Sequence, residues 1–472
     1  MEINKKIYVI ISIAILLSFS SAAAYAFSRS ISVLIDSGHA TGSLAGANMT
    51  AAGADGTSDT FSGTFDVLFE DSSVSINNKT YRMPVTISSS EALQWKSVKY
   101  RGSLYLTQSS GKYLVINNVD VEDYLKGVLK AEMNPKWPIE ALKAQAVIAR
   151  TYAAKSEGKH NGYDMCSTTH CQVYKGLSLE TPQIEEAVSS TAGLILNWQN
   201  GPASVFYHSD SGGITASSLS VWGKQIPYLQ AVTEPMPALG PHSSWQCSLP
   251  MSLIESKLAA NGINTGSVAS LAIAGRDESG RVSLIEIKGS LSTQRVTGHK
   301  FRTIIGSDKI KSTMFNINEK PEPVKTIPVQ TISPQTAKLE SNINTAKIDK
   351  SKMPKDPQEK LVWLTKNKIF TTRELMDMLA KPDKINSYIE IGMARMEGKS
   401  FQQPHSSTVA EPSAKNQINN ITPAGGESIT FYGMGWGHGV GMSQYGAKTL
   451  AENGWDFTGI LEHYFPGTTL GQ

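Results

Sequence analysis

A polar stretch late in the chain divides these 472 residues into two foldable parts of very unequal length. Residues 319–355 are rich in Pro, Thr, Gln, Asn and Lys and contain few aromatic residues, a composition typical of a linker. Apolar periodicity returns over residues 361–396, where Thr371 and Glu374 form a capping box for a short helix. Residues 400–426 are polar again, so any compact fold must be assembled across this interruption.

The sequence therefore predicts a chain in four parts. They are an N-terminal targeting segment (1–27), a first folded part (28–316), a largely disordered insert with a small helical segment (317–427) and a last folded part (428–472). A deletion of the insert would show whether it binds a partner or serves as a spacer.

Composition restricts the class of protein further. Hydrophobic residues make up 40% and charged residues 18%, as in ordinary globular domains. The 44 Lys and Arg residues nearly balance the 41 Asp and Glu residues, which argues against a nucleic-acid partner because binding phosphates needs a marked positive excess. Three cysteines are too few for a scaffold built on disulfides.

The N-terminus predicts export. Lys5 and Lys6 precede an apolar run, Ile7 to Phe19, and an Ala-x-Ala ending at Ala26, the order of a secretory signal. An uncleaved anchor is the alternative, because the uncharged stretch is just long enough to cross a bilayer. Either way, we expect the protein outside the cytoplasm, at the cell envelope, secreted or anchored.

The pattern of apolar residues indicates an α+β fold. Residues 28–115 alternate between apolar and polar in short runs separated by Gly, Ser and Asn, as strands do. From Asp120 to about Ala154 the period becomes helical, and strand-like runs return at 203–207 and 283–287. We expect a single mixed domain with a substrate cleft, interrupted by the insert.

One carboxylate lies on the apolar face of the first predicted helix. Asp120 can cap that helix, and Glu132 occupies the next position on the stripe of apolar residues Val121, Tyr124, Leu125, Val128 and Leu129. Burial would raise the pKa of Glu132, and a neutral carboxyl can protonate a glycosidic oxygen. Two alternatives are a side chain that escapes to water at the frayed helix end and a pair with Arg150.

Two histidines and two cysteines lie within twelve residues: His160, Cys166, His170 and Cys171. This set can hold Zn²⁺ tetrahedrally, although its spacing is not a standard zinc-finger pattern. A Cys166–Cys171 disulfide is the alternative outside the cytoplasm, and it would leave Cys247 single. Because one loop supplies all four ligands, we expect a structural role for the metal.

Polar clusters later in the chain suggest a sugar groove. Ser209, Ser211 and Thr215 offer hydroxyls, and Tyr207 and Trp222 offer ring faces, although turn polarity and core aromatics explain them equally well. A serine protease is excluded because His170 and Ser211 are only about forty residues apart, too close for two barrels.

Glycines mark the last folded part. Residues 435–441 contain several glycines without G-x-G-x-x-G, so they predict a close backbone approach rather than a phosphate site. A helix should follow from Ser443 to Glu452, ending at Asn453-Gly454. We expect His438 and Gln444 to project into the same groove as the hydroxyls.

Several longer motifs resemble the SpoIID/LytB family. They cover most of the chain outside the N-terminal segment and the insert, in the order 121–128, 131–133, 137–153, 166–176, 208–213, 435–447 and 463–468. Sporulation members of that family are similar to lytic transglycosylases, which cleave the MurNAc–GlcNAc bond of glycan strands stripped of peptides and leave a 1,6-anhydro end. The resemblance implies that Glu132 is the catalytic acid and then base.

The same resemblance suggests the other site residues and the partners. It favours zinc at the His/Cys set and no organic cofactor, with peptidoglycan glycan strands as substrate. We expect substrate contacts from Gln145, Arg150, Tyr207, Ser209, Ser211, His438 and Gln444. The alternative is a non-catalytic wall-binding protein, as the amidase-enhancer branch of the family looks, which would stimulate a cell-wall amidase or another wall hydrolase.

Overall fold

A computed structural model describes residues 30–236, 240–319 and 428–471, together with a few single positions between 360 and 393. These residues form two compact units, each of which mixes helices and strands. Unit 1 contains the described residues up to Tyr207, then Ile226–Leu229 and the chain from Asp456 onward. Unit 2 contains His208–Gln225 and the described residues from Gln230 to Trp455. The α+β prediction is confirmed, but the single domain that we expected is divided into two units.

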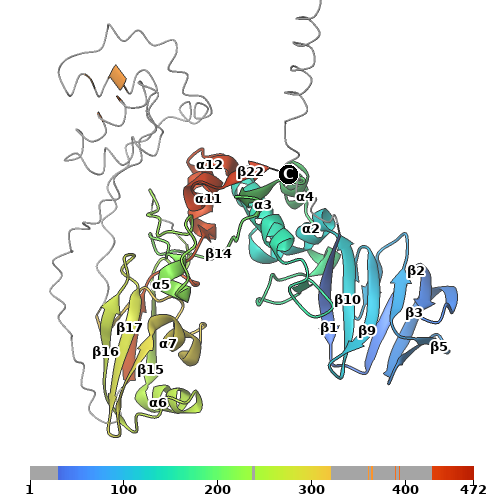
Figure 1. The fold of residues 1–472 in the computed structure, drawn as a ribbon, viewed down its shortest axis with the longest axis horizontal. Coiled ribbons are helices and arrows are strands. Elements are labelled where there is room, and N and C mark those ends of the chain that lie inside the picture. Colours follow the sequence, from blue (N-terminus) through green and yellow to red (C-terminus); the bar gives the residue numbers. More distant parts are fainter. Residues whose placement is uncertain are drawn as a thin grey trace, which may run out of the picture. The chain divides into compact units, whose positions relative to one another are not determined.

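Unit 1 begins with a large, mostly antiparallel sheet, drawn in blue to cyan in Figure 1. Its main path runs β11-β1-β10-β9-β6-β2-β3-β4-β5, and β7 and β8 pair off this path. Alternating burial explains the strands, since Leu104 and Leu106 of one strand point to the core while their neighbours are more exposed. The strands are β1 (Ser30–Ser37), β2 (Thr41–Gly53), β3 (Ser58–Glu70), β4 (Ser73–Ile76), β5 (Lys79–Arg82), β6 (Val85–Ser88), β7 (Leu93–Trp95), β8 (Val98–Tyr100), β9 (Ser103–Ser109), β10 (Lys112–Asp120) and β11 (Met165–Cys166).

The predicted first helix follows the sheet directly. Asp120 ends β10 and caps α2 (Val121–Glu132), accepting a hydrogen bond from the backbone N–H of Glu122 at 2.8 Å. The apolar stripe is buried as expected, and the helix ends just before Asn134-Pro135. Gly127 allows a close approach in mid-helix, because a Cβ there would lie 2.6 Å from the Tyr174 ring.

The remaining elements of unit 1 surround α2 or lie near the C-terminus. Helix α3 begins at Ile139, directly after Pro138, and its alanines pack closely against neighbouring elements. These elements are α3 (Ile139–Lys155), the 3₁₀ turn η1 (Gly176–Leu179), α4 (Pro182–Ser189), β12 (Ile195–Trp198), β13 (Gly201–Pro202), α12 (Phe457–Tyr464) and β22 (Thr469–Gly471). Strand β22 pairs with β12, so the chain's last elements complete this unit.

Among its described residues, unit 2 contains two three-stranded antiparallel sheets and four helices, of which the sequence predicted only the last. Strand β20, beyond the insert, pairs with both β15 and β19, and its Phe431 is buried in the core of this unit. The elements are α5 (Ser218–Trp222), β15 (Trp245–Pro250), α6 (Met251–Ala260), β16 (Val268–Arg276), β17 (Val282–Gly289), β18 (Thr293–Thr297), α7 (Gly298–Ile305), β19 (Phe315–Ile317), β20 (Ser428–Gly433), β21 (Met442–Ser443) and α11 (Gln444–Glu452). Strand β14 (Tyr207–His208) lies where the chain passes from unit 1 to unit 2.

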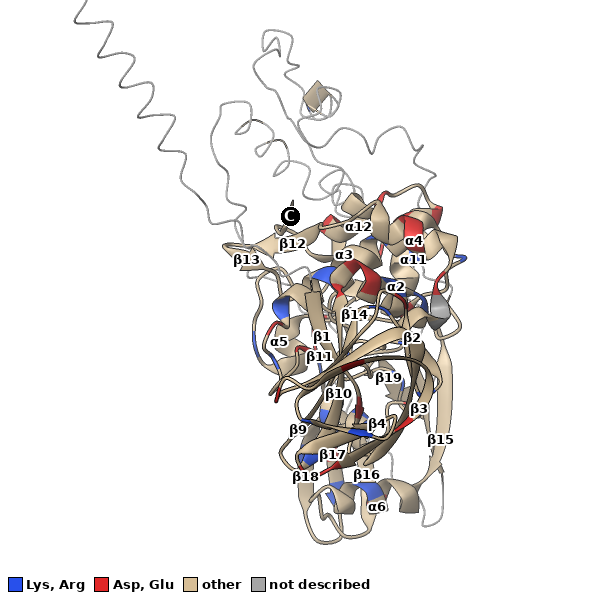
Figure 2. Ribbon diagram, turned by 90° about the vertical axis from the view of Figure 1, so that its right-hand side faces the viewer, with Lys and Arg blue, Asp and Glu red and all other residues tan. Residues whose placement is uncertain are grey.

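Several predictions fall on residues that the structure does not describe. The N-terminal segment 1–27 and the capping box Thr371/Glu374 lie outside the described residues, and the boundaries of the four chain parts stay a prediction. Within the described ranges, no helix is both long enough and apolar enough to span a membrane. Acidic and basic positions both occur along the described elements (Figure 2).

Candidate functional site

Glu132 is the last residue of α2, and its carboxyl is largely shielded from water. Burial raises the pKa of Glu132, while hydrogen bonds from the Val173 backbone N–H (3.1 Å) and the Tyr207 hydroxyl act in the opposite direction. Among the described residues, no cation lies within ion-pair distance of this carboxylate. The C-terminal end of a helix also disfavours a negative charge. This environment therefore favours a protonated carboxyl.

A buried polar network holds the surroundings of Glu132 in place. The Tyr124 hydroxyl donates to the Gln172 side-chain carbonyl at 3.0 Å, and the Tyr207 hydroxyl faces both Gln172 and Glu132. Tyr174 packs against Tyr124 and donates to the Asn117 side chain at 2.9 Å. Sequence reasoning predicted Tyr207 as a site residue but missed Gln172, although Gln172 stands in the same motif as Cys171 and Tyr174.

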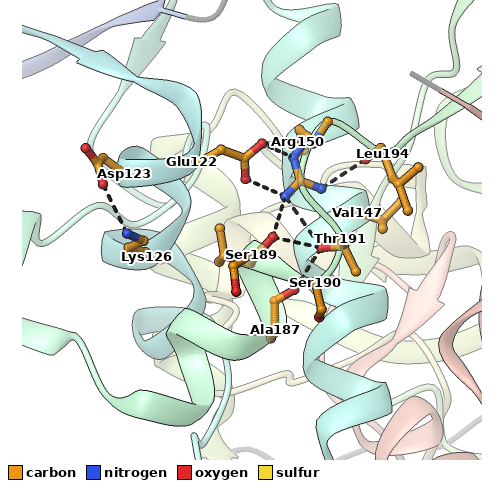
Figure 3. Close-up of polar contacts among 12 residues, drawn as sticks. Glu122, Asp123, Lys126, Val147, Arg150, Ala187, Ser189, Ser190, Thr191 and Leu194 are labelled. Carbon is orange, nitrogen blue, oxygen red and sulfur yellow. Dashed lines mark hydrogen bonds and ion pairs between the residues drawn. The ribbon is translucent and has the colours of Figure 1, made fainter.

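Arg150 was predicted to contact substrate, and in the structure its side chain is buried. Its guanidinium has no exposed surface and forms two hydrogen bonds with Glu122, at 2.8 and 2.6 Å (Figure 3). It also donates to the Leu194 carbonyl at 3.0 Å. Arg150 therefore joins α2 and α3 to the loop after α4. Gln145, also on α3, is fully buried, and its contact with substrate stays a prediction.

The His/Cys set gathers in one loop, as predicted. The Sγ atom of Cys171 lies 3.2 Å from His160 Nε2 and 3.4 Å from His170 Nδ1, and Cys166 Sγ lies 3.6 Å from the same His170 atom. The ligand atoms of His160, His170 and Cys171 lie within 4.8 Å of one another, so these three side chains could share one Zn²⁺ ion. Cys166 as the fourth ligand stays a prediction. Cys166 and Cys171 are free thiols, so the alternative disulfide is not formed. Cys247 is also free and lies against the core of unit 2.

The remaining predicted residues belong to unit 2, where some are buried and others exposed. Ser211 is fully buried, and its hydroxyl accepts from the Gly213 N–H at 2.9 Å, so it stabilises a turn. Gln444 is only 7% exposed at the start of α11. His438 is half-buried and packs against the exposed Trp222, with ring centres 5.4 Å apart.

Backbone contacts position Ser209 and the glycine loop within unit 2. The Ser209 carbonyl accepts from the Tyr445 N–H at 3.0 Å, which ties the predicted hydroxyl segment to α11. A Cβ at Gly437 would lie 2.6 Å from the Cβ of His208, so the glycine loop allows the close backbone approach that its sequence predicted. His438 and Trp222 therefore remain the candidates for substrate contact in this unit, together with Ser209.

Fold and site together define an α+β protein with a shielded carboxyl at a helix end and a His/Cys loop beside it. Residues 109–198, which include both features, match the family described as "SpoIID: Stage II sporulation protein". The resemblance to the SpoIID/LytB family is therefore confirmed over these residues.

Several known proteins are similar to longer stretches of the chain. An uncharacterized protein of Brachyspira hyodysenteriae is 30% identical over 242 residues, which cover 51% of this chain and 64% of the relative. The amidase enhancer of Bacillus subtilis is 28% identical over 346 residues, covering 73% of this chain and 40% of the relative. Stage II sporulation protein D of Bacillus amyloliquefaciens is 24% identical over 375 residues, 76% of each chain. The chain thus spans less than two thirds of the first two relatives.

Proposed function

We propose that this protein is a peptidoglycan lytic transglycosylase that acts at the cell envelope during wall remodelling, as in sporulation. The observation that carries the proposal is Glu132, a carboxyl whose pKa burial raises and which has no cationic partner among the described residues. General acid catalysis needs such a group, because it must hold a proton near neutral pH and release it to the leaving oxygen. The names of the relatives support the setting at the cell wall.

The proposed reaction uses Glu132 twice. Protonated Glu132 gives its proton to the glycosidic oxygen as the bond to C1 of MurNAc breaks. The carboxylate then accepts the proton of the sugar's 6-hydroxyl, whose oxygen bonds to C1 and forms the 1,6-anhydro ring. Glu132 ends protonated and no water is consumed. Tyr207 and the Val173 N–H position the carboxyl and stabilise its charged form between the two steps.

We further propose that His160, Cys166, His170 and Cys171 hold a structural zinc ion. Four protein ligands would close the coordination sphere, so the metal would stabilise the loop. Gln172 and Val173, which face the network around Glu132, follow the last ligand directly in the chain. Metal analysis of the purified protein tests this. We expect one zinc per chain that Cys171→Ser reduces, whereas a full complement of metal in Cys166→Ser and Cys171→Ser would contradict it.

Digestion of purified denuded glycan strands tests the enzymatic proposal. We expect anhydro-sugar ends by mass spectrometry with the wild type, and a loss of about 10²–10⁴-fold with Glu132→Gln. Glu186→Gln is the matched control, since Glu186 is an exposed carboxylate of the same unit, and its activity should be unchanged. Absence of anhydro ends with the wild type would rule the proposal out.

A second candidate is a non-catalytic enhancer of a wall amidase, favoured by the likeness to the B. subtilis amidase enhancer. It predicts glycan binding and stimulation of an added amidase, neither of which depends on Glu132. A Glu132→Gln variant that stimulates amidase as well as the wild type, while neither yields anhydro ends, would favour this candidate.

A further inference from the structure

Trp436 in the glycine loop of unit 2 is a large aromatic residue that stays 37% exposed. Its backbone is held firmly, because Trp436 and Asp210 exchange two N–H···O hydrogen bonds of 2.8 and 3.0 Å. The next residue, Gly437, has φ +125° and has no room for a Cβ against His208. The sequence therefore fixes the loop conformation that presents this indole at the surface.

Lys311 places a positive charge at the same point. Its ammonium lies 4.6 Å from the centre of the Trp436 ring, a cation–π contact. The Lys311 carbonyl accepts from the Gly437 N–H at 2.9 Å, which sets the two segments side by side. No carboxylate within the described ranges forms an ion pair with Lys311. This charge is available to an anionic ligand.

His242 completes the cluster. Its ring meets that of Trp436 nearly at right angles, with centres 4.2 Å apart, and its carbonyl accepts from the Gly435 N–H at 2.8 Å. Partial burial and the neighbouring Lys311 charge both lower the pKa of His242. The imidazole is thus a neutral hydrogen-bonding group near pH 7, and Lys311 is the cation of the cluster.

We propose that Trp436, Lys311 and His242 form a subsite for a sugar that carries a free carboxylate, specifically MurNAc with an unsubstituted lactyl group. The apolar face of the sugar ring would pack on the exposed indole, and the lactyl carboxylate would pair with Lys311. A stem peptide converts that carboxylate into a neutral amide, so the subsite selects denuded strands. This inference rests on the proposed function and adds a determinant of its substrate.

Binding rather than cleavage tests the subsite. The full chain carrying Glu132→Gln would be titrated calorimetrically with a denuded GlcNAc–MurNAc tetrasaccharide, with the same sugar converted to lactyl amides, and with chitotetraose. We expect the free carboxylate to improve affinity about five- to tenfold over both neutral ligands. This preference should weaken with added salt, because the charge lies near the surface.

Matched variants identify the side chain responsible for the preference for the free carboxylate. Lys311→Gln should bind all three ligands alike, Lys311→Arg should restore the preference, and Lys300→Gln, an exposed lysine of α7, should keep it. Trp436→Ala should weaken all three ligands. Equal affinity of the starting protein for acid and amide sugars, or a preference that survives Lys311→Gln, would overturn the subsite. The binding assay is independent of cleavage, so either proposal can fail alone.

Discussion

The two ends of α2 carry the same residue type in opposite surroundings. Glu122, in the first turn, lies at the end where the helix dipole favours a negative charge and forms two hydrogen bonds with the buried Arg150. Glu132, in the last turn, lies at the end that disfavours a negative charge, and it receives only a backbone N–H and a tyrosine hydroxyl.

The different surroundings of Glu122 and Glu132 indicate different roles, one in stability and one in chemistry. A charge balanced by a guanidinium helps to hold elements together, as Glu122 does with Arg150. A shielded carboxyl without a cation keeps its proton more readily and can give it to a substrate. Burial alone therefore does not distinguish the two roles, but the identity of the partner does.

The largest expected effect is a loss of stability when the ion pair of Glu122 and Arg150 at the start of α2 is broken. Arg150→Met should lower the free energy of unfolding by about 3 kcal/mol, because it removes the cation that pairs with the half-buried Glu122 and the donor to the Leu194 carbonyl. Urea denaturation measures this. Adding Glu122→Gln to the variant should recover part of the loss. A change below about 1 kcal/mol would mean that the pair does not hold the helices together.

A smaller loss of stability is expected when the N-cap of α2, Asp120, is replaced. Asp120→Ala removes the oxygen that caps the Glu122 N–H and should cost about 1 kcal/mol, whereas Asp120→Asn retains a capping oxygen and should cost little. Thermal unfolding of both variants measures the difference. Equal stability of the two would show that the cap contributes nothing.

The pH profile of glycan cleavage tests the role of Glu132 as the acid. Activity should fall as pH rises through the pKa of Glu132, because the first step needs the protonated acid. The hydrogen bond from Tyr207 lowers that pKa, so Tyr207→Phe should move the basic limb of kcat to higher pH. If the basic limb of the pH profile does not move, the Tyr207 hydroxyl does not affect the pKa of Glu132.

The smallest expected effect is a gain in stability when Glu132 is replaced by a neutral side chain. Because folding raises the pKa of Glu132, the stabilising contribution of its protonated form is complete below the unfolded pKa and is lost as pH rises through the folded one. Glu132→Gln should therefore melt higher than the wild type at neutral pH and equally at low pH. A lower melting temperature of the variant at pH 7 would contradict the raised pKa.

Local pattern predicted much of the site. The apolar stripe of α2 and its cap are readable because helical period and capping depend on neighbours in sequence. The same pattern placed Glu132 on the shielded face, and the short loop brought His160, His170 and Cys171 together. The partners of Arg150, Glu122 and the Leu194 carbonyl, were not predicted because they are 28 and 44 residues away in sequence.

The sequence by itself determined the alternation of strands and helices, the position of Glu132 on α2 and the choice of possible metal ligands. Only the tertiary structure decided which glutamate meets a cation, that Tyr207 reaches Glu132, and that Trp436 lies beside Lys311. It also divided the described residues into two units. The reason is physical: periodicity and capping act over a few residues, whereas burial and ion pairing depend on segments that only folding brings together.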